Sequence, residues 1–212
     1  MKTLLQILSI TILSFTITTT SYANDNTNSK KIYSGYIITN NGDTLHGKIQ
    51  MLSPTLNEVK VKFIDKAGKK KIYKAKEVQT YSFVVLTSKN KKHSAETITY
   101  VRKKVKHTPV PFGPKNVLVE RPVEGELNLY NYYVETRARN YPFEHFFYVE
   151  KDNELIKVNR KNFKKAVKRI VADYPELKAK VGKKGYGYKH MTKIIAEYNE
   201  TKPRSGEVVE MG

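Results

Sequence analysis

Lysines near the C-terminus are the residues whose type and spacing point most directly to a chemistry, the binding of anions. The 43 residues from Arg160 to Lys202 carry 13 Lys or Arg and 4 Asp or Glu, about three times the net positive charge per residue of the preceding chain. Such a concentration of cations favours anionic ligands. The candidate anion-binding residues are Lys161, Lys164, Lys165, Lys168, Lys183 and Lys184. The alternative is that these lysines only solvate the surface.

Tyrosines form the second candidate set, because the chain has 15 of them. Aromatic rings interleaved with basic residues on a sheet can stack against sugars or bases. Tyr130 and Tyr132 are two residues apart and would share one face of a strand, whereas Tyr133 would point away. Tyr130 and Tyr132 are therefore candidate aromatic contacts. Tyrosine is also a common strand residue that packs in cores, which is the alternative.

The sequence carries no recognisable motif for catalysis, metal binding or cofactor binding. The chain has no Cys, no HExxH, no Gly-x-Ser-x-Gly elbow and no Walker spacing. Its five histidines lie in separate segments, at His46, His93, His107, His145 and His190. We therefore expect no catalytic residues, no metal and no cofactor. A hydrolase acting on envelope glycans or lipids is an alternative that would require Asp43, His46 and Glu144 to converge within about 4 Å.

The N-terminus has the features of an export signal. Lys2 precedes an apolar run that extends to about Ile17, and Ser21-Tyr22-Ala23 offers small residues of the kind that a signal peptidase reads. The run is short and interrupted by polar residues, which argues against an uncleaved membrane anchor. We predict a signal peptide over residues 1–23, a disordered lead-in over 24–31 and a disordered tail over 203–212.

Export defines the compartment and the partners that we expect. The export signal predicts a periplasmic, extracellular or outer-surface location. Because the chain has no Cys, it cannot carry a lipid anchor on a cysteine or form disulfides. The net charge is +19, which becomes +18 once the signal peptide with Lys2 is removed. The expected partner is an anionic envelope component, namely a lipid headgroup, lipopolysaccharide or an acidic glycan, or another envelope protein. Export counts against nucleic acid, and no transmembrane span is expected after cleavage.

Strands come first among the elements that must position these residues. Tyr36 to Thr39 and Thr44 to Met51 flank Asn41-Gly42, which is a strong hairpin signal. Alternating apolar and polar residues continue from Glu58 onward and predict about ten strands, most of them joined by short turns. The proline-rich stretch 107–114 is expected to be a loop.

From Asn159 the apolar residues repeat with a helical period, and Asn159 is the expected N-cap. Pro175 and Gly182 bracket a second, short helix. The stripe of the first helix is Phe163, Val167, Ile170, Val171 and Tyr174, and that of the last is Met191, Ile194, Ile195 and Tyr198. The lysines of the first helix fall opposite its stripe, so we expect the stripe to cover the sheet and the lysines to face water.

The pattern as a whole predicts an α+β fold in one domain over residues 32–202. Its β-rich part, 32–159, would be a mainly antiparallel meander, barrel-like or sandwich-like, and its helical part, 160–202, would pack two or three helices on that sheet.

Three short motifs near the N-terminus, Gly35-Tyr36-Ile37, Gly42-Asp43-Thr44 and Gly47-Lys48-Ile49, are followed by Gly125-Glu126-Leu127, Pro175-Glu176-Leu177 and Ile195 to Asn199. In these features the chain resembles a group of uncharacterised exported proteins of Bacteroidota-type bacteria, in which a GYI…GDT…GKI hairpin opens the mature chain. The resemblance implies export, strands first and helices last. It implies no catalytic residues.

Together these observations favour an exported, non-enzymatic binding or structural protein of the cell envelope that engages an anionic partner through its basic helical end. The alternatives are the envelope hydrolase and a protein–protein interaction module, which would present an apolar patch beside an open sheet edge.

Overall fold

The computed structural model describes residues 31–89, 92–106, 113, 115–136 and 143–201. The predicted signal peptide and C-terminal tail lie outside the described residues, as do all of the predicted lead-in except Lys31 and all of the proline-rich stretch except Gly113.

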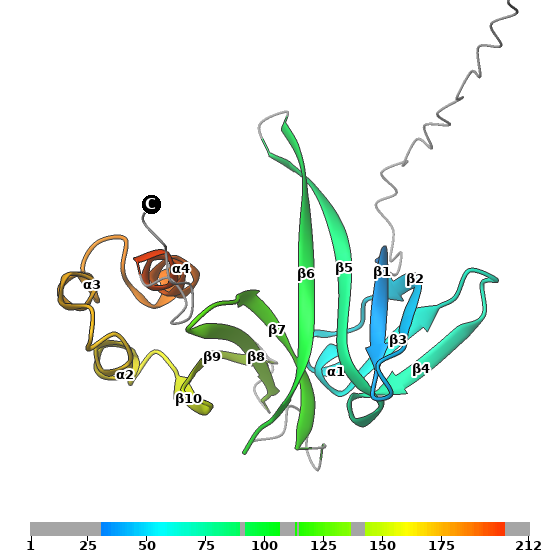
Figure 1. The fold of residues 1–212 in the computed structure, drawn as a ribbon, viewed down its shortest axis with the longest axis horizontal. Helices are drawn as coiled ribbons and strands as arrows, with labels where there is room; N and C mark the ends of the chain where they lie inside the picture. The colour runs from blue at the N-terminus through cyan, green and yellow to red at the C-terminus, as the bar shows by residue number, and fades with distance from the viewer. Residues whose placement is uncertain (1–30, 90–91, 107–112, 114, 137–142, 202–212) are drawn as a thin grey trace, which may run out of the picture.

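The described residues form ten strands in one antiparallel sheet, as the alternation of apolar residues predicted. The sheet order is β10-β9-β8-β7-β6-β5-β1-β2-β3-β4, so the N-terminal strand lies between β2 and β5 and the rest is a meander. The long β5–β6 hairpin stands between β1–β4 on one side and β7–β10 with the C-terminal helices on the other (Figure 1). The strands are β1 Ile32–Thr39, β2 Thr44–Gln50, β3 Lys60–Ile64, β4 Lys70–Lys74, β5 Val78–Lys89, β6 Lys92–Lys104, β7 Asn116–Val123, β8 Asn128–Glu135, β9 Phe143–Lys151 and β10 Glu154–Val158.

Two glycines of the N-terminal motif explain how this part of the sheet packs so closely. Gly35 and Gly47 face each other across β1 and β2. A Cβ on Gly35 would lie 2.2 Å from the carbonyl oxygen of Ser82 on β5, and one on Gly47 would lie 2.3 Å from the carbonyl oxygen of Ile64 on β3. Only a residue without a side chain allows this approach.

The sheet is buried on both faces in its C-terminal half. Neighbouring residues of β8 alternate between two cores, since Leu129 packs with the helices while Tyr130 and Tyr132 pack on the opposite face. A third core fills the concave side of β1–β5 around Ile37, Phe83 and other side chains. Three separate clusters therefore stabilise one continuous sheet.

Three of the four α-helices follow the sheet, as predicted, and their apolar stripes face it. They are α2 Phe163–Ile170, α3 Pro175–Lys180 and α4 Met191–Thr201, and the short 3₁₀ turns are η1 Ala75–Glu77 and η2 Tyr188–His190. The predicted N-cap was wrong, because α2 is capped by Asn162 and not by Asn159. The two Asn residues instead exchange backbone-to-side-chain hydrogen bonds of 2.8 and 3.0 Å, which form a tight turn ahead of the helix.

The remaining helix, α1 Pro54–Val59, was not predicted. It occupies residues that were partly assigned to a strand, and it packs against β3, β7 and β8. Its buried side chains are polar: Asn57 bonds both backbone groups of Leu52, and Thr55 donates to Glu135. Because this helix is short and its buried side is polar, its sequence lacks the repeat of apolar residues that would predict a helix.

The side chain of Asn199 joins the last helix to the turn that precedes β8. Asn199 Oδ1 accepts from the backbone N–H of Leu127, and Asn199 Nδ2 donates to the backbone carbonyl of the same residue, both at 2.9 Å. A Cβ on Gly125 would lie 2.3 Å from Asn199 Nδ2. The Gly125-Glu126-Leu127 and Ile195-to-Asn199 motifs, which are far apart in sequence, are therefore in direct contact.

Replacing Asn199 with Ala is expected to lower the free energy of unfolding by about 2 kcal/mol, because two backbone groups of Leu127 lose their partner. The measurement is urea unfolding followed by circular dichroism. Thr192→Ala, on the exposed side of the same helix, is the matched control and should change the value by less than about 0.5 kcal/mol. Equal effects of the two variants would contradict this role for Asn199.

Candidate functional site

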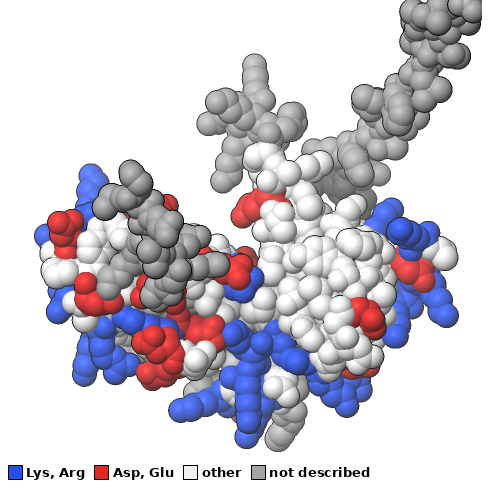
Figure 2. Space-filling view, viewed as in Figure 1, with Lys and Arg blue, Asp and Glu red and all other residues white. Residues whose placement is uncertain are grey.

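The six candidate lysines are all exposed, and two segments bring them together. Lys164, Lys165 and Lys168 lie on the outer side of α2, with Lys161 just before the helix. Lys183 and Lys184 lie in the turn after α3. The point where Gly182 would carry a Cβ is 2.8 Å from Lys164 Cε, so the Lys164 side chain runs along this turn. Figure 2 shows Lys and Arg at the margin of the molecule where Figure 1 places α2 and α3.

Two acidic residues of the helical region, Asp173 and Glu197, form ion pairs with lysines outside the candidate set. In the helical region, the described ion pairs join Lys151 to Asp173 at 3.4 Å and Lys180 to Glu197 at 2.7 Å. The hydrogen bond from Lys180 lowers the pKa of the Glu197 carboxyl, which also accepts from Tyr186. Within the described part of the chain, none of the six candidate lysines belongs to an ion pair. Their charges therefore remain available to an external anion.

A small depression next to α2 adds one cation, Arg169, that was not among the candidates from the sequence. It has a volume of about 210 Å³, and Lys157, Lys165 and Arg169 are among the residues that line it. The ammonium group of Lys157 lies 3.7 Å from the centre of the Phe146 ring, which fixes this lysine by a cation–π contact. Phe146 belongs to the core on the face opposite α2, so the Lys157 ammonium points away from the lysines of the helix. We name the exposed lysines of α2 and of residues 183–184, with Lys161 and Arg169, the basic surface.

Tyr130 and Tyr132 do not form a platform for a ligand. Their side chains are 1% and 0% exposed, because both faces of β8 are covered. The Tyr130 hydroxyl donates to Glu150 at 2.5 Å, and Tyr132 packs edge-on to Phe146. The expectation of surface aromatic contacts was therefore wrong for this pair, and the core alternative holds. Their shared orientation, opposite to that of Tyr133, was as predicted.

The residues that a hydrolase would need do not converge. His46 lies on β2 and its ring is 5.8 Å from that of Tyr36, while Glu144 lies on β9 in the other half of the sheet. Asp43 accepts a hydrogen bond from Thr39 in the first turn. In the described residues no group of three His, Asp or Glu side chains is arranged to hold a metal.

Glu58 is a buried acid that no pattern in the sequence indicated. Glu58 of α1 is 1% exposed, and its Oε1 accepts from the backbone N–H of Tyr133 at 2.7 Å. Burial raises the pKa of this carboxyl to about 9. Tyr133 pairs with His145 of β9 but has no paired residue on β7, so Glu58 takes the place of a β7 partner for its N–H. Its burial closes it to a dissolved substrate, and its role here is structural.

Comparison with family models, with curated proteins and with solved structures finds no match to this chain. Over the residues that the structure describes, no helix has both the length and the apolar character needed to span a membrane.

Proposed function

We propose that the protein is an exported, non-enzymatic binding or structural protein of the cell envelope, and that its basic surface holds an anionic component there. The observation that carries this proposal is the group of exposed lysines contributed by α2 and by the turn at residues 183–184, which form no ion pair with the residues that the structure describes. Lipid phosphate, lipopolysaccharide and acidic glycans are the anions that an exported protein meets, and phosphate on a membrane surface is the form that we would test first.

The packing of α2 determines the kind of binding that is proposed. Its apolar residues Phe163, Val167 and Ile170 are at most 5% exposed and belong to the core shared with β8 and β9. They are not available for insertion into a bilayer, as the apolar face of an interfacial helix would be. The contact with an anionic surface is therefore electrostatic, and it should weaken as salt rises.

Sedimentation with lipid vesicles tests the proposal. We expect the purified protein to bind vesicles containing phosphatidylglycerol at low salt, to bind less at physiological salt and not to bind phosphatidylcholine vesicles. Changing Lys161, Lys164, Lys165 and Lys168 to Gln should lower the partition coefficient at least tenfold, since each lysine near an anionic surface contributes about 1 kcal/mol.

A matched control separates this surface from overall charge. Changing Lys31, Lys104, Lys106 and Lys115 to Gln removes the same charge from exposed lysines outside this surface and should reduce vesicle binding by less than about threefold. Equal losses in the two variants, or no binding by the original protein, would overturn the proposal for lipid phosphate.

A protein–protein interaction module is the second candidate function, because apolar side chains are exposed on the other half of the sheet. Ile72 on β4 and Val84 and Leu86 on β5 are 53%, 39% and 70% exposed. All three point to the face opposite the core of β1–β5. Ile72 lies on the edge strand β4, whereas Val84 and Leu86 lie on the interior strand β5. An exposed apolar residue on an open sheet edge is typical of a protein-binding surface.

A further inference from the structure

Strand β4 is an open edge of the sheet. In the strand order of the described residues, it has β3 on one side and no neighbour on the other. Its five residues, Lys70 to Lys74, alternate in direction, so that Lys71 and Tyr73 point to the inner face while Lys70, Ile72 and Lys74 point to the outer one. An edge of this kind presents unpaired backbone N–H and C=O groups to a further strand.

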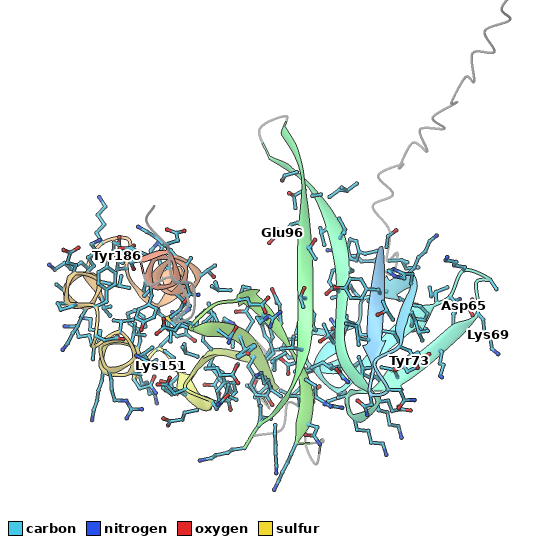
Figure 3. The ribbon with its side chains drawn as sticks, in the orientation of Figure 1. Asp65, Lys69, Tyr73, Glu96, Lys151 and Tyr186 are labelled. Carbon is cyan, nitrogen blue, oxygen red and sulfur yellow. The ribbon has the colours of Figure 1, made fainter. Side chains whose placement is uncertain are left out.

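A groove lies beside this edge on the inner face. It has a volume of about 700 Å³, within the range of about 300–1,000 Å³ that is usual for ligand sites. Its apolar lining comes from Leu45, Phe63 and Tyr73, and Lys66, Lys69, Lys70 and Lys71 also line it. Figure 3 shows Asp65 and Lys69 at the outer end of the β3–β4 hairpin, with Tyr73 closer to the body of the sheet.

The hairpin and the turn that follows it are strongly basic. Between Lys60 and Glu77 there are eight Lys and only two acidic residues. Both acids are turned back to the backbone: Asp65 accepts from the N–H of Lys69 at 2.8 Å, and Glu77 accepts from the N–H of Lys74 at 2.7 Å. The lysines of this hairpin form no ion pair with any described residue.

We propose that β4 receives an acidic, extended segment of a partner protein, which adds to the sheet as an eleventh strand. Backbone hydrogen bonds to the open edge would supply affinity, and alternate side chains would enter the groove beside Tyr73 or lie next to Ile72. Lysines on the edge repel the same edge of another copy, so they disfavour self-association and select an acidic strand. This inference concerns a surface separate from the basic surface. It rests on the second candidate function, the protein–protein interaction module, and does not depend on anion binding.

The register of β4 suggests a probe. An antiparallel strand opposite Lys74, Tyr73, Ile72, Lys71 and Lys70 would carry Glu, Phe, Ile, Glu and Glu in that order, which pairs opposite charges and apolar side chains directly. The probe is the fluorescein-labelled peptide Thr-Glu-Phe-Ile-Glu-Glu-Thr, and binding to the purified protein is followed by fluorescence anisotropy.

Backbone methylation distinguishes strand addition from general attraction of charge. Only every second N–H of an added strand faces the sheet. Of two probes methylated on alternate sets of backbone nitrogens, one should therefore lose at least tenfold in affinity and the other should bind nearly as well as the parent peptide. Hydrogen exchange of the β4 amides should slow when the parent peptide binds.

Charge reversal locates the site. Lys70→Glu, Lys71→Glu and Lys74→Glu together should weaken peptide binding at least tenfold, whereas the same change at Lys161, Lys164 and Lys165 should leave it within about twofold. Equal binding of the two methylated probes, or equal effects of the two triple variants, would overturn the proposal. The vesicle assay tests the basic surface, so its result does not depend on whether the peptide binds β4.

Discussion

Replacing Glu58 with Gln is expected to raise the free energy of unfolding by about 4 kcal/mol at pH 7.5 and to change it by less than about 1 kcal/mol near pH 4. The carboxyl is buried, and removal from water is the largest cause that raises its pKa from 4.5 to about 9. The hydrogen bond from Tyr133 lowers the pKa, and the nearby Glu120 raises it further. Gln keeps an oxygen for the N–H of Tyr133 and has no charge to bury.

The sign of the effect follows from proton binding. Because the folded protein binds this proton more tightly than the unfolded chain does, the stability from Glu58 is fully present below pH 4.5. It is lost as pH rises from 4.5 to about 9, at about 1.4 kcal/mol for each pH unit. Urea unfolding at several pH values should therefore show a steep decline in the original protein and a flatter profile in Glu58→Gln.

Glu154→Gln is the control, since it removes an exposed carboxyl from β10 and should leave the profile unchanged. A gain in Glu58→Gln that is equal at pH 4 and pH 7.5 would mean that packing, and not ionisation, is responsible. No gain at any pH would show that the carboxyl is not held neutral in the folded protein.

Gly47→Ala should have the second large effect, a loss of about 3 kcal/mol or more in the free energy of unfolding. The added Cβ would lie 2.3 Å from the carbonyl oxygen of Ile64 and 2.6 Å from Cζ of Phe63. Backbone atoms of a central strand cannot yield as an exposed side chain can, so β2 and β3 would have to separate. The loss should appear as a lower midpoint of urea unfolding.

Gly42→Ala separates this steric effect from backbone strain. Gly42 has a φ of +88°, but a Cβ there meets nothing within 4 Å. Its replacement should cost only about 1–2 kcal/mol, the strain of a left-handed residue. If Gly47→Ala does not fold, the soluble yields of the two variants are compared instead, and Gly47→Ala should give the lower yield. A smaller loss at Gly47 than at Gly42 would contradict the close approach of β2 and β3.

The elements that could be predicted from the sequence are those whose signal is local. Asn41-Gly42 and the alternation after it indicated the first hairpin, which β1 and β2 form. The stripes from Met191 to Tyr198 and from Phe163 to Ile170 were buried as predicted. Each of these depends on residues within about ten positions of one another.

Elements that depend on distant parts of the chain could not be predicted. The place of β1 between β2 and β5 is decided by pairing with residues that follow some 40 positions later, and the edge position of β4 follows from that order. Tyr130 and Tyr132 could not be assigned to the surface or to the core from the sequence, because alternation within a strand does not show that β8 is covered on both faces.

The candidate site was predictable in part. The charge of residues 160–202 led directly to the lysines of α2, but the contact of Lys164 with the Gly182 turn requires the tertiary fold. The charge near the β3–β4 hairpin was missed, although its alternation predicted strands, because the eight lysines between Lys60 and Glu77 were averaged with a long, less basic stretch. A count in windows of about 20 residues would have found it.

The position of β1 also has a consequence for the order of events during folding. The β1–β2 turn joins strands that lie within residues 32–50, but the second neighbour of β1 comes from residues 78–89. Because closing a longer loop costs more entropy, the β1–β2 hairpin is expected to form first, with one side of β1 unpaired. The first hairpin to form thus depends on a later strand for completion, and until that strand pairs, chaperones or other chains can compete for the open edge.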